Sequence, residues 1–401
     1  MKIQINPSCA FGTVKAPASK SISHRALIMG AFSDKSVIEN IAFSKDIIAT
    51  LDCLKAIGAN VLINGNTVTI GGLNIRDIPD NVQLPCNESG STLRFLLPIC
   101  MAAGKNITLK GANRLFERPL NIYEDIAEEQ GITFQKSENS VTVCGNLKSG
   151  DYSVPGNISS QFITGLLFTL PFLSGNSKIT VTDKFESASY IDLTVKTMRD
   201  FGIIINRKDN VFEISGNQKP NGIGFKVEGD CSNAAFLEAF NYLGGKVSVE
   251  NLNSDTLQGD RVYKDIFEGL CSQQKLFDLS DCPDLAPVCF AVASRFGGAK
   301  FTGTKRLKIK ESDRAEVMKK ELSKFGIEVT VEENNVTVKN GNLQKPNENL
   351  NGHNDHRIVM SLALLCSVTG GIIDGAEAVS KSYPCFFEEI KSIGIDVNEI
   401  N

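Results

Sequence analysis

The sequence predicts an α/β protein of two domains, each built from three similar units of helices and strands. Three observations support this: the chain length, a recurring pattern of helix, glycine and hairpin, and the regular spacing of that pattern. At 401 residues, the chain exceeds what one compact core usually accommodates, so two domains of roughly 200 residues each are expected. Its 42% hydrophobic and 22% charged residues are ordinary for a globular protein.

The recurring pattern is a helix that ends at a glycine and is followed by two short strands around a polar turn. Glycine readily adopts the left-handed conformation in which many helices end. Polar residues between two runs of alternating apolar residues then predict a hairpin. The glycines of the pattern are Gly58, Gly131, Gly202, Gly326 and Gly394.

The spacing of these glycines predicts the number of units. They lie about 70 residues apart, except that the gap between Gly202 and Gly326 is about twice as long. A weaker match around Gly269 fits inside this gap, so six units of about 67 residues account for the chain. A solenoid is the competing repeat architecture, but its units are typically about 20–50 residues long. Three units in each of two domains is therefore the better prediction.

The charge and the hydropathy of the chain exclude several classes of protein. A net charge of -4 and a pI near 5.6 give no reason to expect a nucleic-acid partner. Any anion site must therefore be a local concentration of Lys and Arg. The N-terminus shows no secretory signal. The most apolar stretch, 162–173, is shorter than the ~20 residues that span a bilayer, which favours a core helix. A cytoplasmic protein without a membrane partner is expected.

Cysteine and histidine usage predicts neither disulfides nor a metal site. The 11 cysteines form no C-x-x-C pair and are interpreted as reduced core residues. Cys86, Cys282 and Cys385 lie near the motifs described below, so a catalytic thiol among them is the alternative. The three histidines, His24, His353 and His356, have no metal-ligand spacing. Neither a dinucleotide-binding glycine motif nor a P-loop occurs, so no cofactor is expected.

Polar, often basic, clusters begin several of the predicted helices. Ser21 is expected to cap the first of these helices, with Arg25 one turn further on the same face. Helix N-termini favour phosphate and carboxylate groups, and arginine adds a bidentate fork. Each cluster alone is also consistent with a helix cap followed by a solvated charge. Six clusters in register within a repeat favour one shared anion cleft between the domains. The clusters occupy residues 17–21, 88–92, 159–161, 187–190, 310–314 and 354–357.

These clusters contain motifs that resemble the 5-enolpyruvylshikimate-3-phosphate synthase family. The most specific are Lys-Glu-Ser-Asp-Arg at 310–314 and Asn-Asp-His-Arg at 354–357. Lys-Ser-Ile-Ser-His-Arg at 20–25 also matches, and Glu-Arg-Pro and Ser-Ser-Gln are weaker signals. The matching motifs follow the family's order from Lys20 to Lys381 and cover essentially the whole chain. They lie at 20–25, 117–119, 159–161, 190–192, 283–284, 310–314, 355–357 and 381–384.

The resemblance implies a fold and a domain division. Each domain is expected to be an inside-out α/β barrel of three βαβαββ repeats, with mixed parallel and antiparallel sheets outside and helices inside. Residues 1–18 and 228–401 would form a discontinuous C-terminal domain that includes the N-terminal strand, and residues 19–227 the N-terminal domain. The active site would lie in the cleft between them. Closure of the two domains on shikimate 3-phosphate would complete the site and exclude water.

The resemblance also implies two substrates and the residues that bind them. No partner macromolecule is implied, and a monomer is expected. For phosphoenolpyruvate the implied residues are Lys20, Gly90, Arg118, Gln161, Arg314, Arg357 and Lys381. For shikimate 3-phosphate they are Lys20, Ser21, Arg25, Ser159, Ser160, Gln161, Ser187, Tyr190, Asp284 and Lys310.

Asp284, Glu311 and Lys20 are the implied catalytic residues. Asp284 would accept the proton of the attacking 5-hydroxyl, because a neutral hydroxyl is a poor nucleophile. Glu311 would protonate the methylene carbon of phosphoenolpyruvate, and the cations would stabilise the departing phosphate. Asp284 is also consistent with a helix cap before Leu285, and Glu311 with a surface ion pair. His24 and His356 are interpreted as structural neighbours of the adjacent arginines.

The sequence departs from the common family pattern at a few positions. Glu88 and Ser91 stand where the family's glycine loop often carries Asn and Thr, and Lys308 stands where arginine is usual. Arg306 is a candidate contact for the shikimate phosphate.

The alternative function is the related enolpyruvyl transfer to UDP-N-acetylglucosamine, which predicts a Lys-Asn pair near the N-terminus. Lys20 is followed by serine instead. A non-catalytic anion-binding module of the same fold is the other alternative, and it predicts the loss of Asp284, Glu311 or Lys20.

Overall fold

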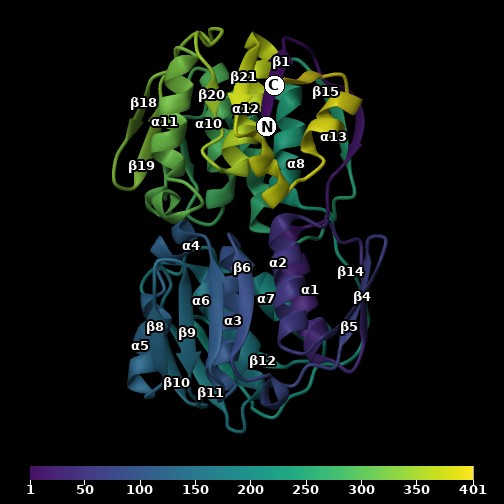
Figure 1. Ribbon diagram of the computed structural model, residues 1–401. Coiled ribbons are helices and arrows are strands. Elements are labelled where there is room, and N and C mark those ends of the chain that lie inside the picture. The colour runs from purple at the N-terminus through teal and green to yellow at the C-terminus, as the bar shows by residue number, and fades with distance from the viewer. Residues whose placement is uncertain (401) are drawn as a thin grey trace. The chain divides into compact units, whose positions relative to one another are not determined.

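The computed structural model describes residues 1–400 and divides into two compact units (Figure 1). Unit 1 comprises residues 1–17 together with those from 229 onward, and unit 2 comprises residues 18–228. The chain therefore passes from one unit to the other twice. Both units combine buried helices with small mixed sheets, as predicted from the alternation of helix and strand patterns.

Unit 2 contains three four-stranded sheets with one shared topology. In each sheet the first two strands are parallel, and the remaining neighbours are antiparallel. In two of the sheets a βαβ crossover followed by a hairpin produces this order, whereas in the other sheet the parallel neighbour is residues 224–226 from the end of the unit. The sheets are β14(Gly224–Lys226)–β3(Ser36–Glu39)–β5(Thr67–Gly71)–β4(Asn60–Asn64), β6(Val82–Asn87)–β7(Ile107–Gly111)–β9(Ser140–Cys144)–β8(Thr133–Lys136) and β10(Asp151–Pro155)–β11(Ser177–Thr182)–β13(Val211–Ile214)–β12(Ile205–Lys208).

Unit 1 repeats this topology twice and then departs from it. The N-terminal strand β1 lies between β21 and β22, antiparallel to both, and so completes a sheet that the C-terminal segment begins. The third sheet has only two parallel strands. The sheets are β16(Leu276–Asp278)–β17(Ala299–Thr302)–β19(Asn335–Val338)–β18(Val329–Val331), β20(Leu350–Asn351)–β21(Gly371–Asp374)–β1(Lys2–Asn6)–β22(Asp396–Ile400) and β15(Lys246–Glu250)–β2(Phe11–Lys15).

Helices fill the interior of each unit. α1, α3 and α6 in unit 2, and α8, α10 and α12 in unit 1, are buried along nearly their whole length. Most sheet strands instead alternate buried and exposed residues, which places helices inside and sheets outside. The helices are α1(Lys20–Phe32), α2(Lys45–Ala56), α3(Gly90–Ala102), α4(Asn113–Glu117), α5(Asn121–Glu129), α6(Ser160–Thr169), α7(Ala188–Asp200), α8(Cys231–Glu238), α9(Tyr263–Cys271), α10(Ala286–Arg295), α11(Arg314–Lys324), α12(His356–Thr369) and α13(Phe386–Ser392).

The glycines predicted to end helices adopt the left-handed conformation. Gly58, Gly131, Gly202, Gly326 and Gly394 all have φ between 67° and 107°. Each of the first four is followed by the predicted hairpin, and Gly394 is followed by β22 alone.

The prediction of a sixth hairpin after Gly269 was wrong. Gly269 lies inside α9, where its Cα lies close to Phe277, and a Cβ would meet that ring at 2.9 Å. The left-handed residue beyond this helix is Gln273, with φ of 61°. Gly269 is therefore a packing glycine rather than a helix end, and the single strand β16 follows.

Two predicted helix caps also differ from the structure. α1 begins at Lys20, with Ser19 in the cap position, so Ser21 is inside the first turn and is not the cap. The backbone N–H of Ser19 donates to Glu228 O, 2.8 Å away, which fixes the start of the helix two residues earlier than its apolar pattern indicates. Asp284 lies within the short 3-10 turn Pro283–Leu285 and forms no side-chain cap.

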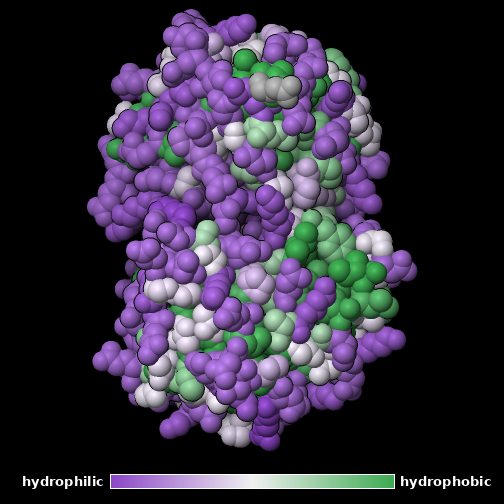
Figure 2. Space-filling model, in the orientation of Figure 1, coloured by the Kyte–Doolittle hydropathy of each residue, from purple (hydrophilic) through white to green (hydrophobic). Residues whose placement is uncertain are grey.

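The outer surface of unit 2 includes an apolar region over β4 and β5. Figure 2 shows green side chains gathered there, and Leu62 and Ile63 of β4 are 68% and 44% exposed. β4 is an edge strand of its sheet, so this surface combines unpaired backbone groups with apolar side chains. Among residues 1–400, no helix is both long and apolar enough to cross a membrane. The apolar segment 162–173 instead forms α6 and the 3-10 turn after it.

Candidate functional site

The polar clusters lie at helix starts in both units. In unit 2, Ser89 and Ser159 cap α3 and α6 by accepting from backbone N–H groups of the first turn. In unit 1, Asp313 and Asp355 cap α11 and α12 in the same way. Serine and aspartate accept from the otherwise unpaired N–H groups at a helix start, so each cap also fixes the side chains that follow it.

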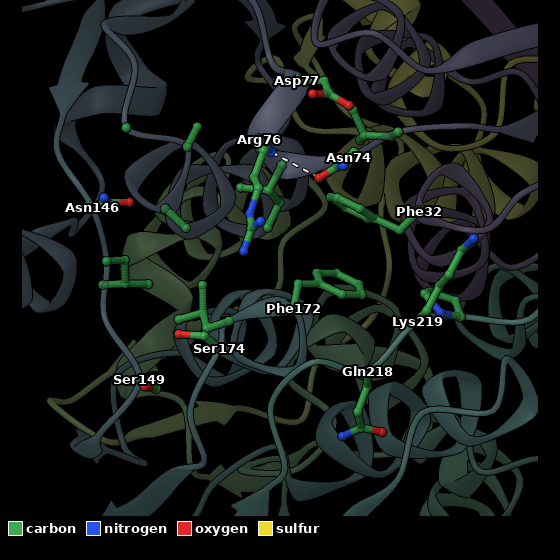
Figure 3. A pocket seen from close by; sticks show the side chains of 18 of the residues that line it. Phe32, Asn74, Arg76, Asp77, Asn146, Ser149, Phe172, Ser174, Gln218 and Lys219 are labelled. Atoms are coloured by element: carbon green, nitrogen blue, oxygen red, sulfur yellow. Dashed lines mark hydrogen bonds between the residues drawn. The ribbon is translucent and has the colours of Figure 1, made fainter.

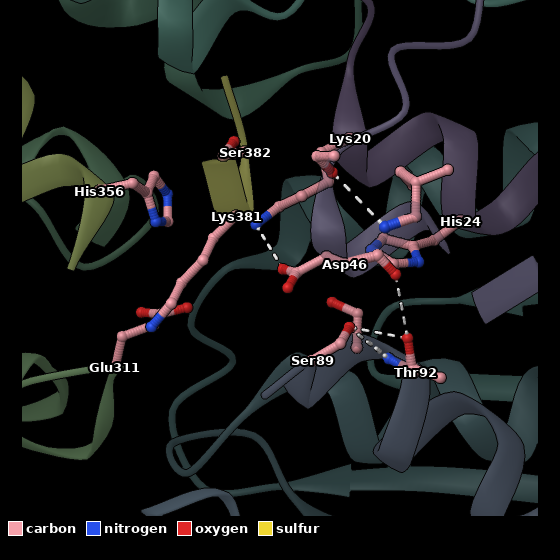
Figure 4. A network of polar contacts seen from close by, with 12 residues as sticks. Lys20, His24, Asp46, Ser89, Thr92, Glu311, His356, Lys381 and Ser382 are labelled. Atoms are coloured by element: carbon pink, nitrogen blue, oxygen red, sulfur yellow. Dashed lines mark hydrogen bonds and ion pairs between the residues drawn. The ribbon is translucent and has the colours of Figure 1, made fainter. Parts of the chain in front are cut away.

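Lys20 begins α1 and pairs with a carboxylate that the sequence analysis did not single out. Its Nζ lies 2.8 Å from Asp46 Oδ2 on α2, and both side chains are largely buried. Beside this pair, hydrogen bonds join His24 to Thr50, Thr50 to Thr92, and Thr92 to the cap Ser89. Figure 4 shows Thr92 bonded to Ser89 and to the backbone oxygen of Asp46. Burial, and then the charges of Lys20 and Arg25, hold the pKa of His24 well below its usual range. His24 is therefore a neutral structural residue at neutral pH, as predicted.

Arg25 joins α1 to α7 through two hydrogen bonds and makes a third within α1. Its guanidinium donates to Thr194 Oγ1 at 2.9 Å, to Tyr190 O at 2.9 Å and to Ser21 O at 2.7 Å. Burial lowers the pKa of Arg25 to about 10, so it remains a cation at neutral pH. Ser187, at the start of α7, is held in the left-handed conformation with φ of 55°. The predicted residues Ser21, Arg25, Ser187 and Tyr190 thus belong to two helix starts that Arg25 connects.

Arg94 organises the glycine loop of unit 2, a role that the sequence analysis did not assign to it. It donates to Gln161 Oε1 at 2.9 Å and to Pro119 O at 3.0 Å. Gln161 in turn donates to Ser91 Oγ at 3.1 Å. A Cβ built on Gly90 would lie only 2.6 Å from Arg118 Nη1. Gly90, Arg118 and Gln161 are therefore neighbours, and the absence of a side chain at Gly90 leaves room for the Arg118 guanidinium.

Asp284 is the centre of the cluster in unit 1. Its carboxylate lies 2.7 Å from Arg314 Nη1, 3.1 Å from Arg357 Nη2 and 3.2 Å from Lys310 Nζ. Arg314 also bonds Glu311 at 2.8 Å and Asp355 at 2.9 Å. The structure therefore places the two predicted catalytic carboxylates against the same guanidinium. A helix cap or a solvated surface ion pair would not need this shared contact.

The charges in this cluster shift the pKa of its members strongly. Burial by itself raises the pKa of Asp284, but Arg357, Lys310 and Arg314 outweigh it and hold that pKa well below its usual range. Burial is also the largest influence on Lys310 and lowers its pKa. Burial by itself would lower the pKa of Arg314. The neighbouring carboxylates of Asp355, Glu311 and Asp284 outweigh burial and raise that pKa. Asp284 is thus an ionised carboxylate, as a proton acceptor must be.

Asp355 connects the arginines of this cluster and was not among the predicted site residues. It is fully buried, and its carboxylate accepts from Arg314 Nε at 2.9 Å, Ser312 Oγ at 3.0 Å and the backbone N–H of Arg357 at 3.0 Å. Its sequence signal was its place directly before His356 and Arg357, where an aspartate is a preferred helix cap.

Lys381 lies in the same unit, and its ammonium donates to the backbone oxygen of Asn354. Lys381 is therefore tied to the residue that precedes the cap of α12. Arg306, the candidate contact for a shikimate phosphate, is buried and donates instead to the backbone oxygen of Ser280.

A cavity of about 1150 Å³ in unit 2 lies at the opposite ends of the same helices (Figure 3). α1, α3 and the turn after α6 reach it at Phe32, Ala102 and Phe172. Arg76 points into it beside the stacked rings of Phe32 and Phe172. Helix C-termini carry partial negative charge, which accounts for basic residues around their ends. This cavity contains none of the predicted site residues.

The cysteines near the motifs do not have the properties of reactive thiols. Cys86 is fully buried, and its hydrogen bond with Cys53 together with burial raises its pKa well above the usual value. Burial likewise raises the pKa of Cys282 and of Cys385. A thiolate is the reactive form, so a raised pKa argues against reactivity in all three. Cys86 and Cys282 are buried packing residues, whereas Cys385 is exposed.

Two sets of basic side chains at helix starts, on repeated α/β units, define a protein that binds small anions. Comparison with known proteins identifies the family to which this protein belongs. The family model described as EPSP synthase (3-phosphoshikimate 1-carboxyvinyltransferase) matches residues 6–272 and 271–390. The chain therefore belongs to the EPSP synthase family, which confirms the resemblance seen in the motifs.

Individual relatives agree with the family match. The chain is 41% identical to a 3-phosphoshikimate 1-carboxyvinyltransferase of Clostridium acetobutylicum, over 99% of this chain and 98% of the relative. It is 40% identical to the protein of the same name from Clostridium perfringens strain 13, over 98% of both.

Solved structures show the same fold. An EPSP synthase of Acinetobacter baumannii matches with a TM-score of 0.79 at 22% identity and covers 99% of this chain and 100% of that one. A second structure of an EPSP synthase from that organism gives a TM-score of 0.80 at 21% identity, over 100% of both chains. The predicted fold class, two domains with mixed sheets, is confirmed.

Proposed function

We propose that this chain carries out the reaction of its family, the transfer of the enolpyruvyl group of phosphoenolpyruvate to the 5-hydroxyl of shikimate 3-phosphate with release of phosphate. The observation that carries the proposal is the cluster around Asp284. A carboxylate that will accept a proton and three cations that suit a phosphorylated substrate occur there within hydrogen-bond distance of one another. The family match makes enolpyruvyl transfer to UDP-N-acetylglucosamine the less favoured function.

The cations of both units are proposed to bind phosphoenolpyruvate. Arginine forks suit its carboxylate and phosphate, and lysines add compact positive charges. Gly90 leaves space for Arg118, and Gln161 is held beside it by Arg94. The proposed set is Lys20, Gly90, Arg118, Gln161, Arg314, Arg357 and Lys381.

Shikimate 3-phosphate is proposed to bind chiefly to unit 2. Its phosphate suits the serines at the starts of α6 and α7 and the nearby cation Arg25, because hydroxyl and guanidinium groups are strong donors to phosphate. Its ring hydroxyls suit Asp284. The proposed set is Lys20, Ser21, Arg25, Ser159, Ser160, Gln161, Ser187, Tyr190, Asp284 and Lys310.

In the proposed mechanism, Asp284 and Glu311 move the two protons. Asp284 accepts the proton of the 5-hydroxyl as its oxygen bonds to the central carbon of phosphoenolpyruvate, and Glu311 delivers a proton to the methylene carbon. The tetrahedral adduct then loses phosphate and one methyl proton, which regenerates the double bond. Lys20, Arg314 and Arg357 stabilise the charge on the departing phosphate.

The cations that bind Asp284 also set its strength as a base. Arg357, Lys310 and Arg314 hold the pKa of Asp284 low when no anionic ligand competes for these cations. A phosphate or carboxylate that draws Arg314 and Arg357 away weakens these ion pairs, so the Asp284 pKa rises toward the range in which a carboxylate is an effective base. Bound phosphoenolpyruvate would thus prepare the base that its own reaction needs.

Neither unit carries the whole residue set, so we propose that the two units together form the active site. The domain division proposed for the enzyme is residues 1–18 with 228–401, and residues 19–227.

Operation as a monomer in the cytoplasm is also proposed; free thiols suit that compartment, and all 11 cysteines lack a disulfide. Size-exclusion chromatography with light scattering tests the oligomeric state.

Phosphate release from purified protein with shikimate 3-phosphate and phosphoenolpyruvate tests the function. We expect release that depends on both substrates. Release with UDP-N-acetylglucosamine in place of shikimate 3-phosphate would select the alternative enolpyruvyl transfer. Binding of both substrates without release would instead indicate a non-catalytic anion-binding module.

A further inference from the structure

The short loop before α12 has an unusual backbone. His353 and Asn354 are consecutive non-glycine residues in the left-handed conformation, with φ of 48° and 52°. This conformation is unfavourable for residues with a Cβ, least so for asparagine and aspartate. Two such residues in a row therefore require contacts that hold them.

Glu321 of α11 supplies those contacts. Its side chain is fully buried, and its carboxylate lies 2.9 Å from His353 Nε2 and accepts from the backbone N–H of Asn351 at 3.0 Å. Lys324 completes the arrangement at 3.0 Å from the same carboxylate. Within the loop, Asn351 Oδ1 accepts from the backbone N–H of His353 at 2.7 Å. The imidazole of His353 thus joins the loop directly to the side chain of Glu321.

The residues that follow His353 hold three of the proposed phosphoenolpyruvate ligands. The backbone oxygen of Asn354 accepts from Lys381. The carboxylate of Asp355 accepts from Arg314 Nε at 2.9 Å and from the backbone N–H of Arg357 at 3.0 Å. A rotation of the backbone at 353–354 would therefore move the acceptors of the Lys381 and Arg314 side chains, and the cap that fixes the backbone of Arg357 at the start of α12.

We propose that His353 is a positioning residue for phosphoenolpyruvate, acting through its bond to Glu321. The bond fixes the loop, the loop fixes Asn354 O and Asp355, and these orient Lys381, Arg314 and Arg357. His353 itself touches no substrate in this scheme. The inference rests on the proposed binding set, and it adds a residue pair outside that set.

Two readings of His353 predict different behaviour of its variants. If only the left-handed backbone matters, His353→Gly is harmless, because glycine adopts this conformation without strain. If the imidazole bond matters, His353→Gly loses the anchor although it relieves the strain. His353→Gln retains a donor of similar reach, so it is expected to rescue the anchor in part.

Steady-state kinetics of the full-length protein distinguish these readings. For His353→Gly we expect the KM for phosphoenolpyruvate to rise about tenfold, in line with the loss of one hydrogen bond to a charged group. The kcat and the KM for shikimate 3-phosphate should stay within about twofold, because most residues proposed for that substrate lie in unit 2. His353→Gln should recover at least half of the loss in KM on a logarithmic scale.

Lys324→Met is the matched control. It removes another partner of the same carboxylate, so it tests whether any disturbance of Glu321 is sufficient. We expect its Tm to fall at least as far as that of His353→Gly, with an unchanged KM for phosphoenolpyruvate.

Three results would overturn the proposal: an unchanged KM for phosphoenolpyruvate in His353→Gly, equal rises in both KM values, or a His353→Gln variant no better than His353→Gly. Failure of the proposed function is seen separately, as no turnover by the wild-type protein. In that case calorimetric titration with phosphoenolpyruvate still compares wild type with the three variants, and equal affinities would reject the positioning role.

Discussion

Asp284 accepts from three cationic side chains, so its protonation depends on what else those cations bind. Arg314 is shared further, with Glu311 and Asp355. Charge pairs of this kind are costly to break, because the partner left behind is a buried and uncompensated charge. Single substitutions in the cluster therefore affect both stability and chemistry, and the two effects must be measured separately.

Asp284→Asn is expected to lower stability at pH 7 by about 2–3 kcal/mol, because it leaves three cations close together. The pKa of Asp284 is depressed in the folded protein, so its contribution is present above the unfolded pKa of about 3.9 and is lost as pH falls. The stability gap between wild type and variant should therefore narrow between pH 5 and pH 3. Urea unfolding of both proteins at several pH values measures this difference in the free energy of unfolding.

The exposed turn residue Asp209 supplies the control for this experiment, because Asp209→Asn keeps a side chain suited to its φ of 52°. That variant should match wild type at every pH. A gap for Asp284→Asn that does not change with pH would show that its carboxylate has no special ionisation.

Gly90→Ala is expected to weaken phosphoenolpyruvate binding. The new methyl group would lie 2.6 Å from Arg118 Nη1, so the guanidinium must move. Because this is the flexible end of a side chain, the fold should survive, and the KM for phosphoenolpyruvate should rise about tenfold or more. Initial-rate kinetics measure it. Arg118→Ala should raise the same KM, and a normal KM in Gly90→Ala would mean that Arg118 does not bind the substrate.

At the scale of elements, a short segment with a left-handed glycine ends a helix and leads into a pair of strands at four places in the chain. Buried helices such as α1, α3 and α6 carry the proposed binding residues at their N-termini and face a cavity at their C-termini. The N-terminal end of each helix has the unpaired N–H groups and the positive partial charge that suit an anion, whereas the other end does not. Helix direction therefore decides which end of the unit is functional.

The left-handed glycines can be tested by a matched pair of alanine substitutions. A Cβ on Gly131 or on Gly224 would meet no atom within 4 Å, but only Gly131 has a positive φ, of 67°. Gly131→Ala should therefore cost about 1 kcal/mol of stability, while Gly224→Ala should be neutral or slightly stabilising. Chemical unfolding measures both. Equal effects would show that backbone strain is not the reason for glycine at position 131.

At the scale of the whole molecule, the order of segments along the chain does not follow the division into units. β1 pairs with β21 and β22 from the other end of the chain, so unit 1 cannot form before synthesis is complete. Unit 2 is continuous, from residue 18 to residue 228. The proposed binding residues are divided between the two units, so substrate binding is expected to depend on both.

Shikimate 3-phosphate is expected to make the protein more compact, because its proposed ligands include Asp284 and Lys310 of unit 1 as well as the residues of unit 2. Small-angle scattering should show a smaller radius of gyration with the ligand than without it. Arg25→Ala, which removes a proposed phosphate ligand, should show no such change at the same concentration. An unchanged radius for the wild type at saturation would argue against closure.

The amino-acid sequence by itself determined the repeat, the left-handed glycines, the helix starts and the family. These features depend on neighbouring residues, such as a glycine after an apolar helix or a serine before one, and local patterns record them directly. Its errors were also local: Ser21 was placed at a cap that Ser19 occupies, and Gly269 was interpreted as a helix end. In both cases a contact outside the helix decided the outcome: for α1 the bond from Ser19 to the distant Glu228, and for α9 the packing of Gly269 against Phe277, which follows the helix.

Only the tertiary structure decided which charges meet. The pairing of Lys20 with Asp46, the place of Arg94 beside Gln161, and the bond from His353 to Glu321 join residues 26 to 67 positions apart. No periodicity encodes such partners, because each pair forms between side chains of different helices or loops. The sequence therefore proposed the cations and the two carboxylates of the site, and folding determined the neighbours that orient them and shift the pKa of Asp284.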